Sequence, residues 1–270
     1  MILSAGFFTA MNLLVKFLSD FSAAQLIFFR SLGSLFFTFP YLIKNKIPIL
    51  GNEKIWMILR GVAGVTSMGL FFWSANYLAI GTAVSLRYLA PIFATILAAI
   101  FLKEKIKIIQ YLFFLIAFFG VLLIKGFGDT VNATGLFLII CSALSSGFVY
   151  VLINKIGIKD QPVVIVNYFM CIAVITGGIL SIFYWNQTPI GWEWILLLSL
   201  GVFGYFGQLY MTKAFQTQAT NKVVSLKYIE VLFTLVGGVI WLNDTYTFLS
   251  IVGILLVVTG LVLNITYKSK

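Results

Sequence analysis

Long apolar runs separated by short polar breaks fill almost the whole chain. A helix needs about 20 mostly apolar residues to cross a bilayer, because lipid offers no partners for backbone N–H and C=O groups. Cutting the chain at its charged, Pro, Gly and Asn positions predicts ten such helices, at residues 2–18, 22–43, 55–76, 81–102, 107–125, 132–154, 161–183, 192–213, 221–242 and 248–267. The connectors are too short to form a soluble domain. The pattern therefore predicts an all-α polytopic membrane protein.

We expect the first of these segments to be a retained helix rather than a cleaved signal peptide. No basic region precedes its apolar stretch and no small-residue cleavage site follows it, and secretory signal peptides carry both features.

The composition agrees with a chain that lies in lipid. Of its 270 residues 61% are hydrophobic and 10% are charged, whereas a soluble domain carries about 25% charged residues. The formal net charge is +10, but the cations occur in short bursts rather than as the contiguous basic face of a nucleic-acid-binding protein. Cys141 and Cys171 both lie in apolar stretches, which excludes a secreted disulfide scaffold. The expected partners are therefore the lipid bilayer and a small-molecule substrate, with no nucleic acid; monomer and homodimer both stay open.

Lysine and arginine predict the orientation, because they are enriched in cytoplasmic connectors. Two of them, Lys16 and Lys125, fall on one side of the predicted bundle. Thirteen fall on the other side, after the second, fourth, sixth and eighth helices and at the C-terminus: Lys44, Lys46, Lys54, Arg60, Lys103, Lys105, Lys107, Lys155, Lys159, Lys213, Lys222, Lys268 and Lys270. We therefore expect both termini in the cytoplasm and the protein in the cell membrane.

The two halves of the chain resemble each other. A shift of 140 residues aligns residues 84–124 with residues 224–264 without a gap, and 10 of the 41 positions are identical. The two predicted repeats run from 1 to 125 and from 132 to 267. Because each repeat has five helices, an odd number, the two copies must insert in opposite directions. The basic residues between the fourth and fifth helices are missing from the equivalent connector between the ninth and tenth, as inversion requires. Inverted repeats are typical of secondary transporters, with the substrate near the midplane.

Few residues offer catalytic or metal chemistry. The chain has no histidine, no Gly-x-Ser-x-Gly motif, no paired acids on one helix and no phosphate-binding loop. We therefore expect no enzyme activity, no catalytic residue, no cofactor and no metal site, and no ATP-driven transport by this chain alone.

Four ionisable residues stand out within the predicted helices, where a charge is costly and is expected to face the protein interior. Arg87 and Lys227 are repeat equivalents, and Glu230 lies three residues beyond Lys227 on the same helix face. One interpretation places these three in a cavity, with the cations binding an anionic or amino-acid-like substrate and Glu230 acting as a counter-charge or proton site. The alternative makes Lys227 and Glu230 a structural ion pair and lets Arg87 reach the membrane surface or backbone carbonyls. For Arg30 we favour a structural role.

Uncharged polar and aromatic residues within the helices are further candidates for substrate contact, since polar groups facing lipid are costly. These residues are Asn12, Ser67, Trp73, Asn76, Tyr88, Tyr150, Gln208 and Tyr228. Hydrogen bonding between helices is the alternative role for each. The repeat places Tyr88 and Tyr228 near the central axis.

These residues resemble the drug/metabolite transporter superfamily, and specifically its EamA-like branch of ten-helix carriers. The resemblance rests on Asn12 and Lys16, Arg30, Leu59-Arg60-Gly61, Tyr88-Leu89-Ala90-Pro91-Ile92-Phe93, Leu102-Lys103-Glu104 and Tyr228-Ile229-Glu230-Val231-Leu232-Phe233. Two departures are Val231 in place of a proline, the usual cause of a sharp helix bend, and Asn243-Asp244 in place of Gly-Glu.

The resemblance implies ten helices around a central cavity, lined by the third, fourth, eighth and ninth helices with help from the first and sixth. The second helix is not expected to line it. It also implies a secondary transporter that moves a small metabolite or drug-like solute by alternating access. A channel or a non-transporting membrane protein is the alternative. The cargo does not follow, because relatives carry amino acids, sugars, nucleotide derivatives, vitamins and drugs.

Overall fold

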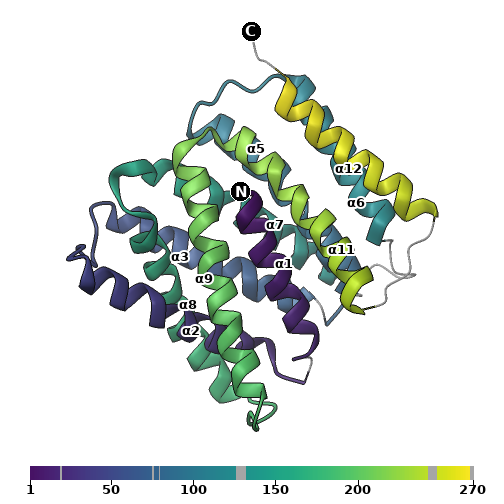
Figure 1. The fold of residues 1–270 in the computed structure, drawn as a ribbon. Helices are drawn as coiled ribbons and strands as arrows, with labels where there is room; N and C mark the ends of the chain where they lie inside the picture. The colour runs from purple at the N-terminus through teal and green to yellow at the C-terminus, as the bar shows by residue number, and fades with distance from the viewer. Residues whose placement is uncertain (19, 75, 79, 126–131, 243–247, 268–270) are drawn as a thin grey trace.

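The computed structural model describes residues 1–18, 20–74, 76–78, 80–125, 132–242 and 248–267, and every regular element in this part of the chain is a helix (Figure 1). The α-helices are α1 (Ile2–Lys16), α2 (Ala23–Lys44), α3 (Lys54–Ser74), α4 (Ile80–Arg87), α5 (Ala90–Phe101), α6 (Ile108–Lys125), α7 (Ala133–Ile156), α8 (Pro162–Phe183), α9 (Glu193–Thr217), α10 (Thr220–Ser225), α11 (Ile229–Leu242) and α12 (Phe248–Thr266). The 3₁₀ turns are η1 (Gly157–Lys159) and η2 (Leu226–Tyr228).

Some residues on which the predicted orientation and the predicted repeat rest lie outside the described part. These are Asn243, Asp244, Lys268 and Lys270. The side chains of Lys16 and Lys125 are also not described.

The chain is an all-helical polytopic membrane protein. Within the described residues, seven helical stretches are long and apolar enough to cross a membrane. Three shorter apolar helices, within α1, α6 and α12, accompany them. Together these stretches correspond to the ten predicted segments. Three of them are shorter than a full span, so the prediction that the chain crosses the membrane ten times stays a prediction.

Two predicted helices are interrupted at equivalent positions. The segment expected at 81–102 divides into α4 and α5, separated by Tyr88 and Leu89. Pro91 explains this break, because it has no N–H to donate to the carbonyl of Arg87 four residues earlier, and Ile92 donates instead to Leu89, three residues back (2.9 Å).

The segment expected at 221–242 divides in the same way, into α10, η2 and α11. Here Val231 stands where the first repeat has its proline, and the chain still leaves the α-helical path through a 3₁₀ turn that ends at Tyr228. The missing proline therefore does not abolish the break, because the N–H of Ile229 bonds three residues back to Leu226 instead of four.

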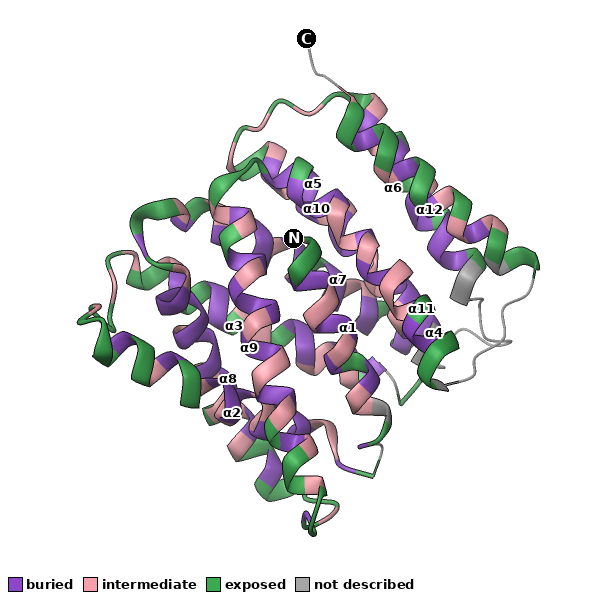
Figure 2. Cartoon of the chain, in the orientation of Figure 1, coloured by how far each residue is buried: buried purple, intermediate pink, exposed green. Residues whose placement is uncertain are grey.

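The packing partners follow the 140-residue shift. α3 packs on α7 as α9 packs on α1, α5 packs on α7 as α11 packs on α1, and α2 packs on α9 as α8 packs on α3. α6 and α12, equivalent under the same shift, lie side by side at one edge of the molecule (Figure 1). α7 and α9, in the middle of the bundle, carry many buried positions, whereas exposed positions are frequent on α12 (Figure 2).

Two carboxylates join the halves of the chain at the end where the basic connectors gather. The Asp160 carboxylate accepts hydrogen bonds from the backbone N–H groups of Asn52 (2.6 Å) and Glu53 (2.8 Å), where α3 begins. The Glu104 carboxylate accepts from the N–H groups of Thr220 (2.8 Å) and Asn221 (3.3 Å), where α10 begins. Both acids satisfy N–H groups that a helix leaves unpaired at its start, and both favour the positive end of the helix dipole.

Candidate functional site

A cavity of about 420 Å³ lies inside the bundle, and its walls come from both halves of the chain. α1, α2, α3, α4 and α5 contribute residues from the first half, and α7, α8, α9, η2 and α11 contribute residues from the second. A volume of this order is typical of small-molecule sites. The expectation that the second helix does not line the cavity is wrong, because Leu26, Ile27 and Arg30 of α2 are part of its wall.

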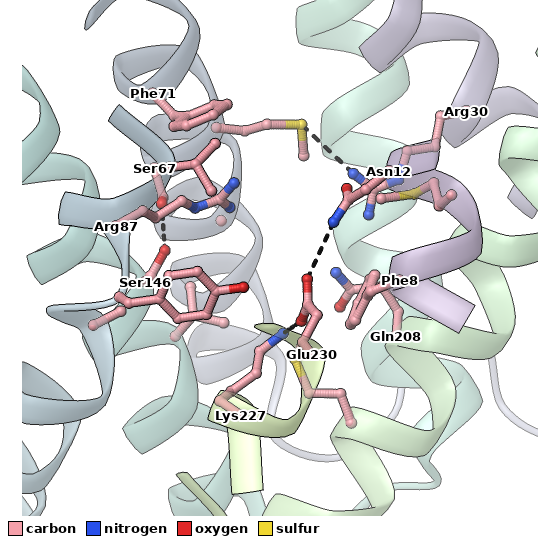
Figure 3. A pocket seen from close by; sticks show the side chains of 18 of the residues that line it. Phe8, Asn12, Arg30, Ser67, Phe71, Arg87, Ser146, Gln208, Lys227 and Glu230 are labelled. Atoms are coloured by element: carbon pink, nitrogen blue, oxygen red, sulfur yellow. Dashed lines mark hydrogen bonds and ion pairs between the residues drawn. The ribbon is translucent and has the colours of Figure 1, made fainter. Parts of the chain in front are cut away.

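Glu230 is the centre of a charged cluster on one side of the cavity (Figure 3). Its carboxylate accepts a hydrogen bond from Lys227 Nζ (2.6 Å) and another from Asn12 Nδ2 (3.2 Å). The ammonium group of Lys227 also lies 4.5 Å from the ring centroid of Phe8, a cation–π contact. The two interpretations of these residues are therefore compatible. Lys227 and Glu230 form an ion pair, and both side chains also line the cavity.

Arg87, the last residue of α4, lies on the other side of the cavity from this cluster (Figure 3). Its guanidinium carbon lies 4.8 Å from the ring centroid of Phe71. Among the described residues no acid forms an ion pair with it. The break after α4 places this cation at a helix end that faces the cavity rather than lipid.

Arg60 is a cavity residue, although the sequence predicts it among the connector cations. It lies in α3, is only 1% exposed, and lines the cavity. Its Nη2 donates to Oε1 of Gln208 (2.6 Å), and its guanidinium lies 4.2 Å from the ring centroid of Phe169. Arg60 lies near the start of an apolar stretch, where cations that flank a membrane helix also occur. No sequence signal distinguishes a buried cavity arginine from such a flanking cation. The count of connector cations on the basic side should therefore exclude it.

Arg30 is half-buried, and its Nη1 lies 3.8 Å from the sulfur of Met68. Arg30 interacts electrostatically with the charges of Arg87 and Glu230, and Arg60 interacts electrostatically with the charge of Arg30. Four cations thus share this cavity with one described acid: Arg30, Arg60, Arg87, Lys227 and Glu230.

Two aromatic candidates meet at the interruptions between helices. Tyr88 lines the cavity, whereas Tyr228 is fully buried behind it and is not a lining residue. The rings stack with centroids 6.0 Å apart, and the Tyr228 hydroxyl donates to the backbone carbonyl of Tyr88 (3.1 Å). Tyr228 therefore supports the wall that Tyr88 forms.

The other uncharged candidates divide into two groups. Asn12, Tyr150, Gln208 and Ser67 line the cavity; Ser67 is also bonded to Ser146 of α7 (2.6 Å). Trp73 and Asn76 do not. Trp73 is 56% exposed and Asn76 is also exposed, because the last turn of α3 and the residues after it turn these side chains away from the interior. Most of the uncharged candidates are expected to point inward, but the structure places these two on the outside.

No three side chains of His, Cys, Asp or Glu gather as metal ligands within the part of the chain that the structure describes.

Comparison with known proteins adds a family and several relatives. The model of the EamA-like transporter family matches the chain twice, over residues 1–126 and 133–266. Human solute carrier family 35 member G1 is 29% identical, over 96% of this chain and 76% of that protein. The pseudopaline exporter CntI of Pseudomonas aeruginosa is 29% identical, over 99% of this chain and 95% of the exporter. A solved crystal structure that covers 97% of this chain has a TM-score of 0.85 at 13% identity, which shows that the fold is shared.

Proposed function

Because the chain belongs to the EamA-like transporter family, and is therefore a membrane transporter of small solutes, we propose that it is a secondary carrier that works by alternating access. The observation that carries this proposal is the cavity itself, whose walls come from both halves of the chain. A site shared by two halves can open to one membrane face or to the other as the halves move against each other.

The interruptions at Tyr88 and Tyr228 support the proposal. Discontinuous helices at equivalent positions of two repeats are typical of transporters whose substrate lies near the bilayer midplane. We propose that residues 1–125 and 132–267 are two inverted repeats, with both termini in the cytoplasm and the chain in the cell membrane.

The acidic contacts at one end of the bundle fit a cycle of this kind. Asp160 belongs to the second half and holds the start of α3 in the first, whereas Glu104 belongs to the first half and holds the start of α10 in the second. The 140-residue shift relates Asp160 to Asp20, which is exposed and has no hydrogen bond or ion pair with a described residue. The halves are therefore tied together at the basic end, while Asp20 makes no such contact with a described residue at the opposite end. We propose that the opposite arrangement forms when the cavity faces the cytoplasm.

The charge of the cavity favours an anionic cargo. Four basic residues face one acid, and that acid is already paired with Lys227. Cations in a low-dielectric site attract carboxylates and phosphates and repel organic cations. We propose that the cargo is a small organic anion.

Counterflow in proteoliposomes tests carrier function. A carrier should take up labelled solutes from a metabolite panel with saturation, and unlabelled solute on the inside should accelerate uptake of the labelled solute. A channel would give flux that rises linearly with concentration and no acceleration. Absence of flux for every solute, in vesicles that contain folded protein, would indicate a non-transporting protein.

A further inference from the structure

Beyond a general preference for anions, we propose that the cavity binds an organic solute that carries at least two separate oxyanion groups, carboxylate or phosphate. One group is held by Arg30 and Arg60, and the other by Arg87 across the cavity. This inference deepens the proposed function and rests on it. It also assigns to Arg60 a role in specificity that its position in the sequence does not suggest.

The first argument is the balance of charge. A buried cation needs a counter-charge, because desolvation costs several kcal/mol for each ion. Lys227 has its counter-charge in Glu230, at 2.6 Å. The three arginines that line the same cavity form no ion pair with any acid that the structure describes. A solute with a single negative charge would offset one of them and leave two.

The second argument is the set of free donors. Nε and Nη1 of Arg60, and Nε of Arg30, are buried and have no hydrogen-bond partner among the described residues. A guanidinium presents its N–H groups as a planar fork that matches the two oxygens of a carboxylate or the oxygens of a phosphate. Two nitrogens of Arg60 are thus buried and unpaired, while its third, Nη2, donates to Gln208.

The third argument is the nature of the contacts that these arginines do make. Arg60 contacts the amide of Gln208 and the ring of Phe169, and Arg30 contacts the sulfur of Met68. These are neutral partners that orient a guanidinium without neutralising it. An arginine that only stabilises the fold would instead pair with a carboxylate or with several backbone carbonyls.

Apolar rings accompany two of the cationic groups in the cavity wall. Phe71 lies under Arg87 and Phe169 lies under Arg60, and both rings line the cavity. A ligand that joins its anionic groups through a short hydrocarbon skeleton would place that skeleton against these rings. An inorganic anion would not use them.

Ligand binding to purified protein in detergent tests this assignment directly. The probes are butyrate and succinate, which share a four-carbon skeleton, with tricarballylate as the three-carboxylate member and 3-phosphoglycerate as the mixed phosphate member. Succinate should bind about tenfold or more tightly than butyrate, since a second charge-assisted hydrogen bond is gained. A stronger response to 3-phosphoglycerate than to succinate would identify phosphate as one of the two groups, and the reverse order would identify carboxylates.

Two variants and a control locate the effect. Arg60→Gln should reduce the preference for succinate over butyrate to about twofold or less, and Arg60→Lys should restore part of it, because it keeps the charge and loses the fork. Lys44→Gln removes the same charge from an exposed position on the last turn of α2 and should leave the preference unchanged. Thermal unfolding without ligand shows that each variant is folded.

Equal affinity for butyrate and succinate, or no binding of any dianion, overturns the inference. So does an unchanged preference in folded Arg60→Gln protein. Saturable counterflow of a neutral or singly charged solute with no response to dianions would leave the carrier function standing while the two-anion site fails. Binding of dianions without counterflow would do the opposite.

Discussion

The hydroxyl group of Tyr228 donates a hydrogen bond to the backbone carbonyl of Tyr88, at 3.1 Å, and the two residues are 140 positions apart. That separation is the shift that aligns the two halves of the sequence. Each tyrosine lies where its segment leaves the α-helical path: Tyr88 between α4 and α5, and Tyr228 at the end of η2, directly before α11. A helix break leaves backbone carbonyls without their helical N–H partners. A carbonyl inside the membrane-embedded part of a protein then needs another hydrogen-bond donor. Tyr228 supplies that donor to the opposite half.

Removal of this hydroxyl should weaken the fold. Tyr228→Phe keeps the ring stack and leaves the Tyr88 carbonyl without its donor, which should cost about 1–3 kcal/mol. Thermal unfolding in detergent measures the loss. Tyr88→Phe is the matched control, because the Tyr88 hydroxyl has no hydrogen bond with a described residue. Equal destabilisation by both variants would contradict the role of the hydrogen bond.

The crossing of α2 and α9 should tolerate no added methyl group. A Cβ at Gly201 would lie 2.5 Å from the Cα of Gly33, so Gly201→Ala must push two backbones apart and should cost about 1–3 kcal/mol or more. Gly69→Ala is the control, because a Cβ there meets nothing within 4 Å. That variant should be neutral or stabilising, by up to about 1 kcal/mol, since alanine favours helix. Comparable melting temperatures for the two variants would exclude a tight crossing.

The contact of Asp160 with the start of α3 should contribute to stability. Asp160→Asn loses one acceptor oxygen and the negative charge, and should cost about 1–3 kcal/mol. Asp20→Asn, at the equivalent exposed position, should leave the melting temperature unchanged. In vesicles, Asp160→Asn should also shift the protein toward the state open to the cytoplasm, measured as faster labelling of a cysteine placed in the cavity from that side. An unshifted labelling rate would separate this contact from gating.

Glu230 is the acid expected to couple transport to protons. Glu230→Gln keeps a hydrogen-bond acceptor for Asn12 but cannot change its charge, so uptake should lose its response to a pH gradient while counterflow persists. The Lys227→Gln/Glu230→Gln double variant is the control, because the single variant leaves a buried ammonium group unpaired. A pH response that survives in a folded Glu230→Gln protein would exclude this residue as the proton site.

Inversion of the two halves predicts opposite locations for equivalent connectors. Cysteines introduced at position 103 and at position 244, in a chain without Cys141 and Cys171, should be labelled by a membrane-impermeant reagent from opposite faces of oriented vesicles. Labelling of both from the same face would rule out inverted repeats.

The sequence was sufficient for the helical architecture. Apolar runs that must satisfy their own backbone groups in lipid can only be helices, and most predicted boundaries fall within a few residues of the observed ones. Because polar groups in apolar segments avoid lipid, it also predicted an inward position for several residues that line the cavity: Arg87, Lys227, Glu230, Asn12, Tyr88, Tyr150 and Gln208.

What the tertiary structure decided is which polar side chains share one space. Arg60 resembles a flanking cation in the sequence and is a buried cavity residue, whereas Trp73 and Asn76 resemble interior residues and lie outside. Helical periodicity cannot distinguish these cases, because every side of an apolar helix is apolar, and only the packing of neighbouring helices determines which side faces the centre. The second break is a further case: Pro91 predicts the first break, whereas no proline stands at the equivalent Val231, and only the structure shows the 3₁₀ turn that ends at Tyr228.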